Sequence, residues 1–351
     1  MPISKFVHSL SRYILVPLAL YISLPIIFKC SGKYAQKLIY LTQMHNVSNL
    51  KNPKQNGVIG RAENLYIRDK NGNRIGIYYI QAHSDSTTNK NNTSYITGTK
   101  IFKSDRPFVI YFHGSKGTRA CGERINLYNI LSQELDYNVL ALDYSGFGDS
   151  EGEADIKNII NSSTALIDFV ETTLKCNFIA WGHSLGGGIL LETLADISSK
   201  YKYLLGIILE STFTSLNDSL YHHPYTLLYN WNTKIMETFI IRTLNKHGVV
   251  FNNKSNISKI NVPILILHSV DDNKIPIQLG QQLYEEAIKK GKTVDMIMYE
   301  GNEKLGHSGI YRANSFKNDI NNYINNCFFH HGKALNMKEL LYNQNENINM
   351  Y

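Results

Sequence analysis

The stretch WGHSLGGG, residues 181–188, places one serine at the centre of a G-x-S-x-G pattern. It follows the apolar run CNFIAWG and precedes the helical pattern LGGGILLETLADIS, so Ser184 is expected at a sharp strand-to-helix turn. A serine there takes strained backbone angles, which are tolerated only if nothing bulky lies two residues away on either side. Gly182 and Gly186 meet that condition. The alternative to a nucleophile is that Ser184 only begins an ordinary glycine-rich turn. The sequence predicts a nucleophile if it also supplies a base, an acid and oxyanion donors.

The surrounding chain has the pattern of an α/β fold. Residues 74–80 alternate in polarity and follow an Asn-Gly turn, which predicts a hairpin. Two later segments, 156–174 and 277–291, show the three-to-four-residue apolar spacing of helices. Short, nearly continuous apolar runs, typical of strands buried on both faces, alternate with such segments, at 107–112, 137–143, 176–182, 204–210, 262–268 and 293–300. We therefore expect a mostly parallel central sheet flanked by helices over residues 61–328.

Several segments lie outside this alternation. Residues 211–258, between two predicted core strands, are rich in aromatic and large aliphatic side chains, which predicts a helical cap after the sixth strand. The polar stretch 83–100 is expected to be an exposed loop. Residues 31–60 are expected to be a linker, and the Asn-rich residues 329–351 a polar C-terminal tail.

Composition narrows the class of protein. The net charge of +7 arises from lysines and arginines scattered through the chain, which indicates weak attraction to acidic surfaces such as anionic lipids and not nucleic-acid recognition. The 4 cysteines are far apart, which excludes a cysteine-rich metal site and disfavours a disulfide framework. N-x-[ST] sequons occur in this Asn-rich chain at Asn46, Asn91, Asn92, Asn161, Asn217, Asn253 and Asn256.

The N-terminal region differs in kind from the rest. Residues 13–28 carry no charge and lie between a short basic flank, 1–12, and several lysines that follow. The run is slightly short for the roughly 20 residues that span a bilayer, but snorkelling lysines and local thinning make up the difference. A cleaved signal peptide or a buried core helix are the alternatives. We expect a transmembrane anchor over residues 13–30, although the lysine bias alone would place the body in the cytosol.

Acid and base candidates follow later strands. Asp271 and Asp272 come directly after the run ILIL, the spacing D-x-x-[IV]-P favours Asp272, and Glu210 is a third possibility. His307 follows the last predicted strand and completes the order Ser, Asp, His that a G-x-S-x-G hydrolase requires. Five other histidines fit that position less well: His183 belongs to the elbow, His222 and His223 lie in the cap, and His330 and His331 lie in the tail.

Backbone N–H groups are the expected oxyanion donors. Leu185 follows the nucleophile and starts a helix, whose dipole favours a developing anion. Ser115 is the second expected donor, because HGSKGTR follows the apolar run ending at residue 112. A plain turn is the alternative interpretation of that loop. Ester hydrolysis by such a site needs no metal or cofactor.

Together the motifs HGSKGTR, LDYSGFGDSEG, WGHSLGGG, LESTFTSL, HSVDDNKIPIQLG and GHSGIY resemble those of an α/β-hydrolase. More closely, with the apolar N-terminal segment and the cap stretch HHPYTLLYN, the chain resembles the membrane-anchored abhydrolase-domain lipases that cleave monoacylglycerols and lysophosphatidylserine. The likeness extends to about residue 328. It departs from the family in the pair Ser115-Lys116 and in an extra glycine after the elbow.

The resemblance implies Ser184 as nucleophile, Asp272 as acid, His307 as base, and Ser115 and Leu185 as oxyanion donors. It also implies a single-pass protein of the endoplasmic reticulum with a lumenal catalytic domain, contrary to the small lysine bias, and we give the resemblance more weight. The expected function is hydrolysis of the acyl ester of single-chain lipids. The alternatives are an acyl-protein thioesterase and a non-catalytic membrane binding protein on a hydrolase scaffold.

Overall fold

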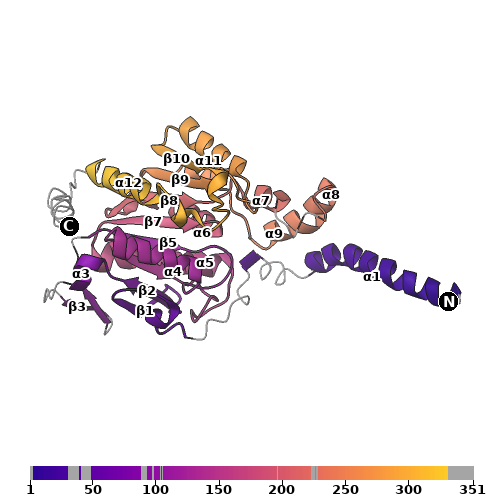
Figure 1. Ribbon diagram of the computed structural model, residues 1–351, viewed down its shortest axis with the longest axis horizontal. Coiled ribbons are helices and arrows are strands. Elements are labelled where there is room, and N and C mark those ends of the chain that lie inside the picture. The colour runs from indigo at the N-terminus through magenta and orange to yellow at the C-terminus, as the bar shows by residue number, and fades with distance from the viewer. Residues whose placement is uncertain are drawn as a thin grey trace.

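The computed structural model describes residues 3–30, 39–40, 49–87, 93–96, 99–102, 104, 106–195, 197–222, 226 and 228–330. A long helix, α1 (Ile3–Cys30), extends away from a body in which helices enclose one large sheet (Figure 1). The predicted tail beyond His330 lies outside these residues, as do the sequons at Asn46, Asn91 and Asn92.

The large sheet has 8 strands in the order β1-β2-β6-β5-β7-β8-β9-β10. The predicted hairpin is confirmed, because β1 (Ala62–Arg68) pairs antiparallel with β2 (Arg74–Ile80). β2 in turn joins β6 antiparallel, and all remaining neighbours are parallel. The parallel strands are β5 (Phe108–Phe112), β6 (Asn138–Leu142), β7 (Phe178–His183), β8 (Leu204–Glu210), β9 (Ile264–Ser269) and β10 (Val294–Tyr299). The mostly parallel sheet predicted from the apolar runs is therefore confirmed.

Helices cover both faces of this sheet because its central strands are apolar on both sides. On β5, Phe108, Ile110 and Phe112 belong to one core, whereas Val109 and Tyr111 belong to the other. The first core is closed by α5 (Ile156–Asp168), α6 (Leu185–Leu194), α10 (Asn253–Ile257) and α11 (Ile277–Lys289). The second is closed by α4 (Gly122–Asn129) and α12 (Phe316–His330).

The strand order creates a switch point around β5. The chain passes from β5 to β6 on one side and then returns to β7 on the other side, so the loops after β5 and β7 diverge. Ligands of open parallel sheets bind in the crevice beyond the carboxyl ends of strands at such a point. The loop 113–121 and the turn at Ser184 both lie there.

The predicted cap is present between β8 and β9. It consists of α7 (Leu216–His222), α8 (Thr233–Ile235), the π-helical segment η6 (Met236–Ile241), α9 (Arg242–Lys246) and α10. β8 is the sixth strand of the large sheet in chain order, as expected. Figure 1 shows α7, α8 and α9 at the end of the body from which α1 emerges.

The polar stretch 83–100 is not simply a loop, contrary to the sequence prediction. It contains a short helix, α3 (His83–Thr87), and the strand β3 (Thr93–Ile96), which pairs antiparallel with β4 (Thr99–Phe102) in a separate two-stranded sheet. Local backbone pairing of this kind leaves no alternating apolar face in the sequence, so hydrophobic patterning could not reveal it.

Two regions near the termini are more ordered than their composition suggested. The helix α1 begins at Ile3 and so includes most of the flank that precedes the expected anchor. Within the expected linker 31–60, Tyr40 is buried in the first core and Pro53–Asn56 form a 3₁₀ turn capped by the Asn52 side chain.

Among the described sequons, Asn161, Asn253 and Asn256 are buried and cannot carry glycans in this fold.

Candidate active site

Ser184 stands on a strained turn between β7 and α6. Its backbone has φ 54° and ψ −120°, outside the regions that non-glycine residues favour. The turn is fixed on one side by the Ser184 N–H, which donates to the Glu210 carbonyl at 2.8 Å. A Cβ on Gly186 would lie 2.0 Å from the Phe112 carbonyl oxygen, and one on Gly182 would lie 2.6 Å from the Gly187 Cα. Glycine is therefore required at both positions by close backbone packing.

His307 reaches this turn from the loop after β10. Its Nε2 lies 2.9 Å from the Ser184 Oγ, and its Nδ1 lies 2.7 Å from the Asp272 Oδ2. The structure thus brings together the three residues expected to form a triad. The distances are those of a nucleophile–base–acid relay in which the acid fixes the imidazole orientation.

Asp272 lies in the loop after β9 and is held as a carboxylate. Burial alone would raise its pKa, but hydrogen bonds from His268 and His307 and from the Ile275 N–H hold the pKa well below its usual range. The other carboxylate oxygen accepts the backbone N–H groups of Lys274 and Ile275 at 2.9 and 3.0 Å. An anion so fixed favours the charged form of the imidazole that develops during proton transfer.

Asp271, the alternative acid, does not touch the imidazole. Its Oδ1 accepts the Ser269 hydroxyl and, at 2.9 Å, the Gly306 N–H, and these hydrogen bonds keep its pKa below the usual range. The carboxylate therefore joins the loop after β9 to the residue just before His307. Asp271 is placed to position the base, and not to pair with it.

Glu210, the third candidate, is buried at the end of β8 and lines the cavity beside the triad. Its Oε2 accepts the Trp181 indole N–H at 2.9 Å, and no bond to His307 is present. Burial raises the pKa of Glu210 to about 7, against the lowering effect of the indole hydrogen bond. Because its pKa is raised and its partner is an indole, Glu210 is not the acid that pairs with His307; that acid is Asp272.

The expected oxyanion loop follows β5. Gly114 packs against the nucleophile so closely that a Cβ there would lie 3.4 Å from the Ser184 Cβ. Ser115 and Leu185 both line the same cavity as Ser184. The loop and the elbow thus face one space, which is the arrangement that paired backbone donors need.

Arg124 and His183 contact the backbone of the two loops that carry the oxyanion donor and the base. The sequence did not point to either role. The buried Arg124 guanidinium donates to the carbonyls of Lys116 and Thr118, which fixes the oxyanion loop. His183 Nε2 lies 2.9 Å from the His307 carbonyl oxygen. Burial, with a smaller electrostatic effect of the neighbouring His307 ring, lowers the pKa of His183 to about 3, so that its ring is a neutral donor. His183 precedes the nucleophile directly, but only the fold shows that it contacts the base loop.

The remaining histidines named from sequence are not near the imidazole of His307. His222 ends α7 in the cap and His330 ends α12, whereas His223 and His331 lie outside the described residues. Within the part of the chain that the structure describes, no group of three His, Cys, Asp or Glu side chains could hold a metal ion.

A cavity of about 810 Å³ opens at Ser184. Its walls are largely apolar and come from the cap, with Leu216, Leu220, Ile240 and Leu244, and from α1, with Leu24, Pro25, Ile27 and Phe28. Two exposed lysines, Lys116 and Lys274, also border it. The nucleophile therefore faces an apolar chamber that carries positive charge at its rim.

The sheet order and the Ser184–His307–Asp272 geometry beyond the strand ends define an α/β-hydrolase. Solved structures agree on the fold. The Pyrococcus furiosus esterase PF2001 is 14% identical, covers 82% of this chain and 97% of its own, and has a TM-score of 0.57. An alpha-beta hydrolase from Vibrio vulnificus is 15% identical, covers 82% and 91%, and has a TM-score of 0.61.

Residues 144–330 match the model of the prolyl oligopeptidase family, and the chain belongs to that family. The sequence is also similar to proteins named lysophosphatidylserine lipase ABHD12. The Danio rerio protein is 28% identical over 324 residues, covering 90% of this chain and 83% of its own. The Rattus norvegicus protein is 28% identical over 311 residues, covering 87% and 77%. The resemblance to abhydrolase-domain lipases seen in the motifs is thereby confirmed.

Gly186→Ala tests the packing that shapes the nucleophile turn. Because the obstructing atom is a backbone oxygen, we expect the free energy of unfolding to fall by at least about 3 kcal/mol, measured by denaturant unfolding. Gly122→Ala, at a helical glycine whose Cβ would meet nothing within 4 Å, is the matched control and should lose no stability. Equal effects of the two substitutions would contradict the packing argument.

Glu210→Gln tests the buried carboxyl. With a folded pKa of about 7 against an ordinary 4.5, the folded protein holds more protons than the unfolded chain between these values, so this group's stabilisation is lost as pH rises through 7. Gln accepts the same indole hydrogen bond without ionising. We therefore expect the variant to gain stability relative to wild type between pH 5 and pH 8, by roughly 1.4 kcal/mol per pKa unit, in unfolding measurements. Glu300→Gln, at an exposed carboxyl, should show no such trend, and a pH-independent difference for Glu210→Gln would refute the argument.

Proposed function

We propose that the protein is a membrane-associated serine hydrolase that cleaves the acyl ester of single-chain lipids. The observation that carries the proposal is the triad geometry, in which Ser184 and His307 line an apolar cavity of about 810 Å³. Apolar walls of this extent suit an acyl chain, because such a chain gains binding free energy only by burying its methylene groups. The relatives named lysophosphatidylserine lipase point to the same substrate class.

In the mechanism, Ser184, His307 and Asp272 act as nucleophile, base and acid. His307 Nε2 takes the proton of the Ser184 hydroxyl as its oxygen attacks the ester carbonyl. His307 Nδ1 donates to Asp272, which fixes the tautomer and stabilises the imidazolium. The backbone N–H groups of Ser115 and Leu185 stabilise the oxyanion. The imidazolium then protonates the leaving alcohol, and a water molecule activated by His307 hydrolyses the acyl-enzyme.

The rim of the cavity favours an anionic head group. Lys116 and Lys274 are exposed residues that border the cavity, and the exposed Glu123 is the acidic residue beside them. Ammonium groups attract the phosphate of a lysophospholipid but gain nothing from the neutral glycerol of a monoacylglycerol. Lysophospholipids, lysophosphatidylserine among them, are therefore the preferred substrates, with monoacylglycerols as the neutral alternative.

Ser184→Ala should lower kcat for lysophosphatidylserine by about 10⁴-fold or more, because the covalent step is removed. The measurement is acyl release by the detergent-solubilised protein, with Ser199→Ala, at an exposed serine, as the matched control. The substrate panel adds a monoacylglycerol, a palmitoyl-thioester peptide and a proline-containing peptide amide. Serine-dependent release confined to the thioester or the peptide would replace the lipid esterase with a thioesterase or a peptidase, and none at all would favour a binding protein.

The location that accords with this function is the endoplasmic reticulum membrane, with α1 as a single-pass anchor and the catalytic domain in the lumen. The segment Tyr13–Cys30 is long and apolar enough to cross a membrane, with a mean hydropathy of 1.9 and 6% of it buried. The lumenal side follows from the resemblance to the abhydrolase-domain lipases and opposes the small lysine bias, which is a weak determinant when charges differ little.

Gly291→Asn tests the lumenal placement. The substitution creates an N-x-T sequon with Thr293 in an exposed turn, where φ is 66° and a Cβ would meet nothing within 4 Å. Asn tolerates this left-handed conformation better than most residues. In a eukaryotic host we expect one glycan more than on wild type, removable by an endoglycosidase. Gly291→Asn combined with Thr293→Ala should carry none, and an unmodified single variant would indicate a cytosolic domain.

A further inference from the structure

The C-terminal part of α1 is docked on the cap. The Tyr21 and Tyr229 rings stack with centroids 4.9 Å apart, and the Tyr229 hydroxyl donates to the Tyr21 carbonyl at 2.9 Å. The Tyr21 hydroxyl donates to the Leu228 carbonyl at 3.0 Å and accepts the Trp231 indole N–H at 2.9 Å. Residues about 200 positions apart are thus joined by both stacking and hydrogen bonds.

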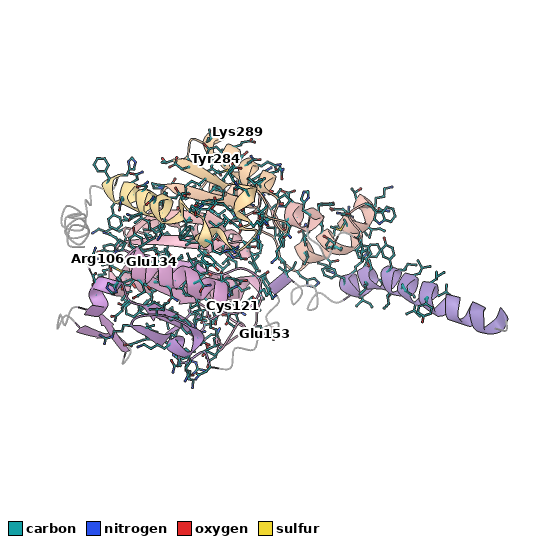
Figure 2. All side chains as sticks on the ribbon, in the orientation of Figure 1. Arg106, Cys121, Glu134, Glu153, Tyr284 and Lys289 are labelled. Atoms are coloured by element: carbon teal, nitrogen blue, oxygen red, sulfur yellow. The ribbon has the colours of Figure 1, made fainter. Side chains whose placement is uncertain are left out.

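A second contact lies two turns further along the helix. The Lys29 ammonium lies 5.0 Å from the centroid of the Phe239 ring, on η6. Contacts at Tyr21 and at Lys29 hold the last turns of α1 along the cap over their whole length. Figure 2 shows the cap beside the C-terminal part of α1, and residues 13–20 of the helix are exposed.

The docked face of α1 is also a wall of the catalytic cavity. Tyr21, Leu24, Pro25 and Phe28 recur at the three-to-four-residue spacing that places side chains on one face of a helix. Leu24, Pro25 and Phe28 line the cavity that also contains Ser184. Without α1, the cavity would be open on that side.

The length of α1 sets where the cap lies relative to a bilayer. Its 28 residues rise about 42 Å, but residues 13–20, which are apolar and not docked, rise only about 12 Å. The hydrocarbon core is about 30 Å thick. The residues before position 13 include Lys5 and Arg12 and cannot lengthen the apolar segment. The segment can span only if its docked part lies in the membrane as well.

The tip of the cap has the surface that such a position needs. Leu228 and Trp231 are 64% and 69% exposed, beside Tyr21 of α1. The indole N–H of Trp231 donates to the Tyr21 hydroxyl and the Leu228 carbonyl, so the ring can enter the hydrocarbon without an unpaired donor. Exposed apolar side chains beside an apolar helix form a continuous surface for lipid.

We propose that the cavity takes the acyl chain directly from the adjacent leaflet, with α1 as one wall of the acyl site and the cap tip, Leu228 and Trp231, immersed beside it. The inference rests on the proposed function for the identity of the chain as an acyl ester. It adds that the anchor selects substrate as well as tethering the enzyme. A single-chain lipid can then reach Ser184 without leaving the membrane.

Phe28→Ala tests the wall. The measured quantity is the ratio of kcat/KM for an oleoyl ester to that for a butyryl ester of the same alcohol, in detergent. Lost apolar contact along the chain should lower this ratio about tenfold. Phe28→Trp, which keeps the packing and fills the cavity, should also lower it by excluding longer chains. Ile26→Ala, on a 47% exposed position of α1 that does not line the cavity, is the matched control and should leave the ratio within about twofold.

An unchanged ratio in both Phe28 variants, or an equal fall in Ile26→Ala, would overturn the role of α1 in the acyl site. Serine-dependent butyryl hydrolysis is measured in the same preparations. If wild type shows no serine-dependent butyryl hydrolysis, the proposed function is wrong. If it shows this activity but the oleoyl-to-butyryl ratio is unchanged in the Phe28 variants, only the role of α1 as a wall of the acyl site is wrong.

Tryptophan fluorescence tests the immersion of the cap without turnover. The chain has 2 tryptophans, of which Trp181 is buried and Trp231 is exposed on the cap tip. In vesicles of phosphatidylcholine brominated on the acyl chain, we expect quenching of wild-type emission and its loss in Trp231→Phe. No quenching of wild type, or equal quenching in Trp231→Phe, would place the cap outside the leaflet and overturn the proposal.

Discussion

The close approach of the α6 backbone to the end of β5 is the constraint on which the active site depends. The Phe112 carbonyl leaves no space for a side chain at position 186, and this contact packs the nucleophile turn against the strand that precedes the oxyanion loop. Because β5 and β7 are hydrogen-bonded neighbours, the loop and the turn cannot move apart without breaking the centre of the sheet. The strained φ of Ser184 persists because packing over-determines it.

The acidic side chains around this turn each have a different partner. The ionised Asp272 lies beside His307. Glu210, at the end of β8, instead accepts the indole N–H of Trp181, and burial raises its pKa to about 7. Behind the oxyanion loop lies the buried Asp143 carboxylate. Burial would raise its pKa, but the Arg119 charge and a hydrogen bond from His113 keep the pKa low. One acidic group therefore pairs with the base, Glu210 pairs with an indole of the sheet, and Asp143 stabilises the loop that follows β5.

The cap and α1 extend the same site beyond the strand ends. The cap supplies one apolar wall and α1 another, and stacking of Tyr21 on Tyr229 keeps the two together. An anchor that only tethered the domain would need no such contacts. Because α1 lines the chamber at Ser184, the proposed function makes substrate access and membrane attachment depend on the same helix.

The sequence by itself determined most strands of the large sheet and the candidate residues of the triad. Apolar runs alternating with helical patterns predicted the strands within a few residues, since strands buried on both faces must be apolar throughout. The order Ser184, Asp272, His307 named the residues that the fold brings together, because each follows a strand end. Only the tertiary structure separated Asp272 from Asp271 by contact, set Glu210 against Trp181, and placed Arg124 and His183 behind the loops. It alone joined α1 to the cap, because contacts between residues about 200 positions apart leave no periodic signal in a sequence. Patterning records which face of an element is buried, and only the fold decides what buries it.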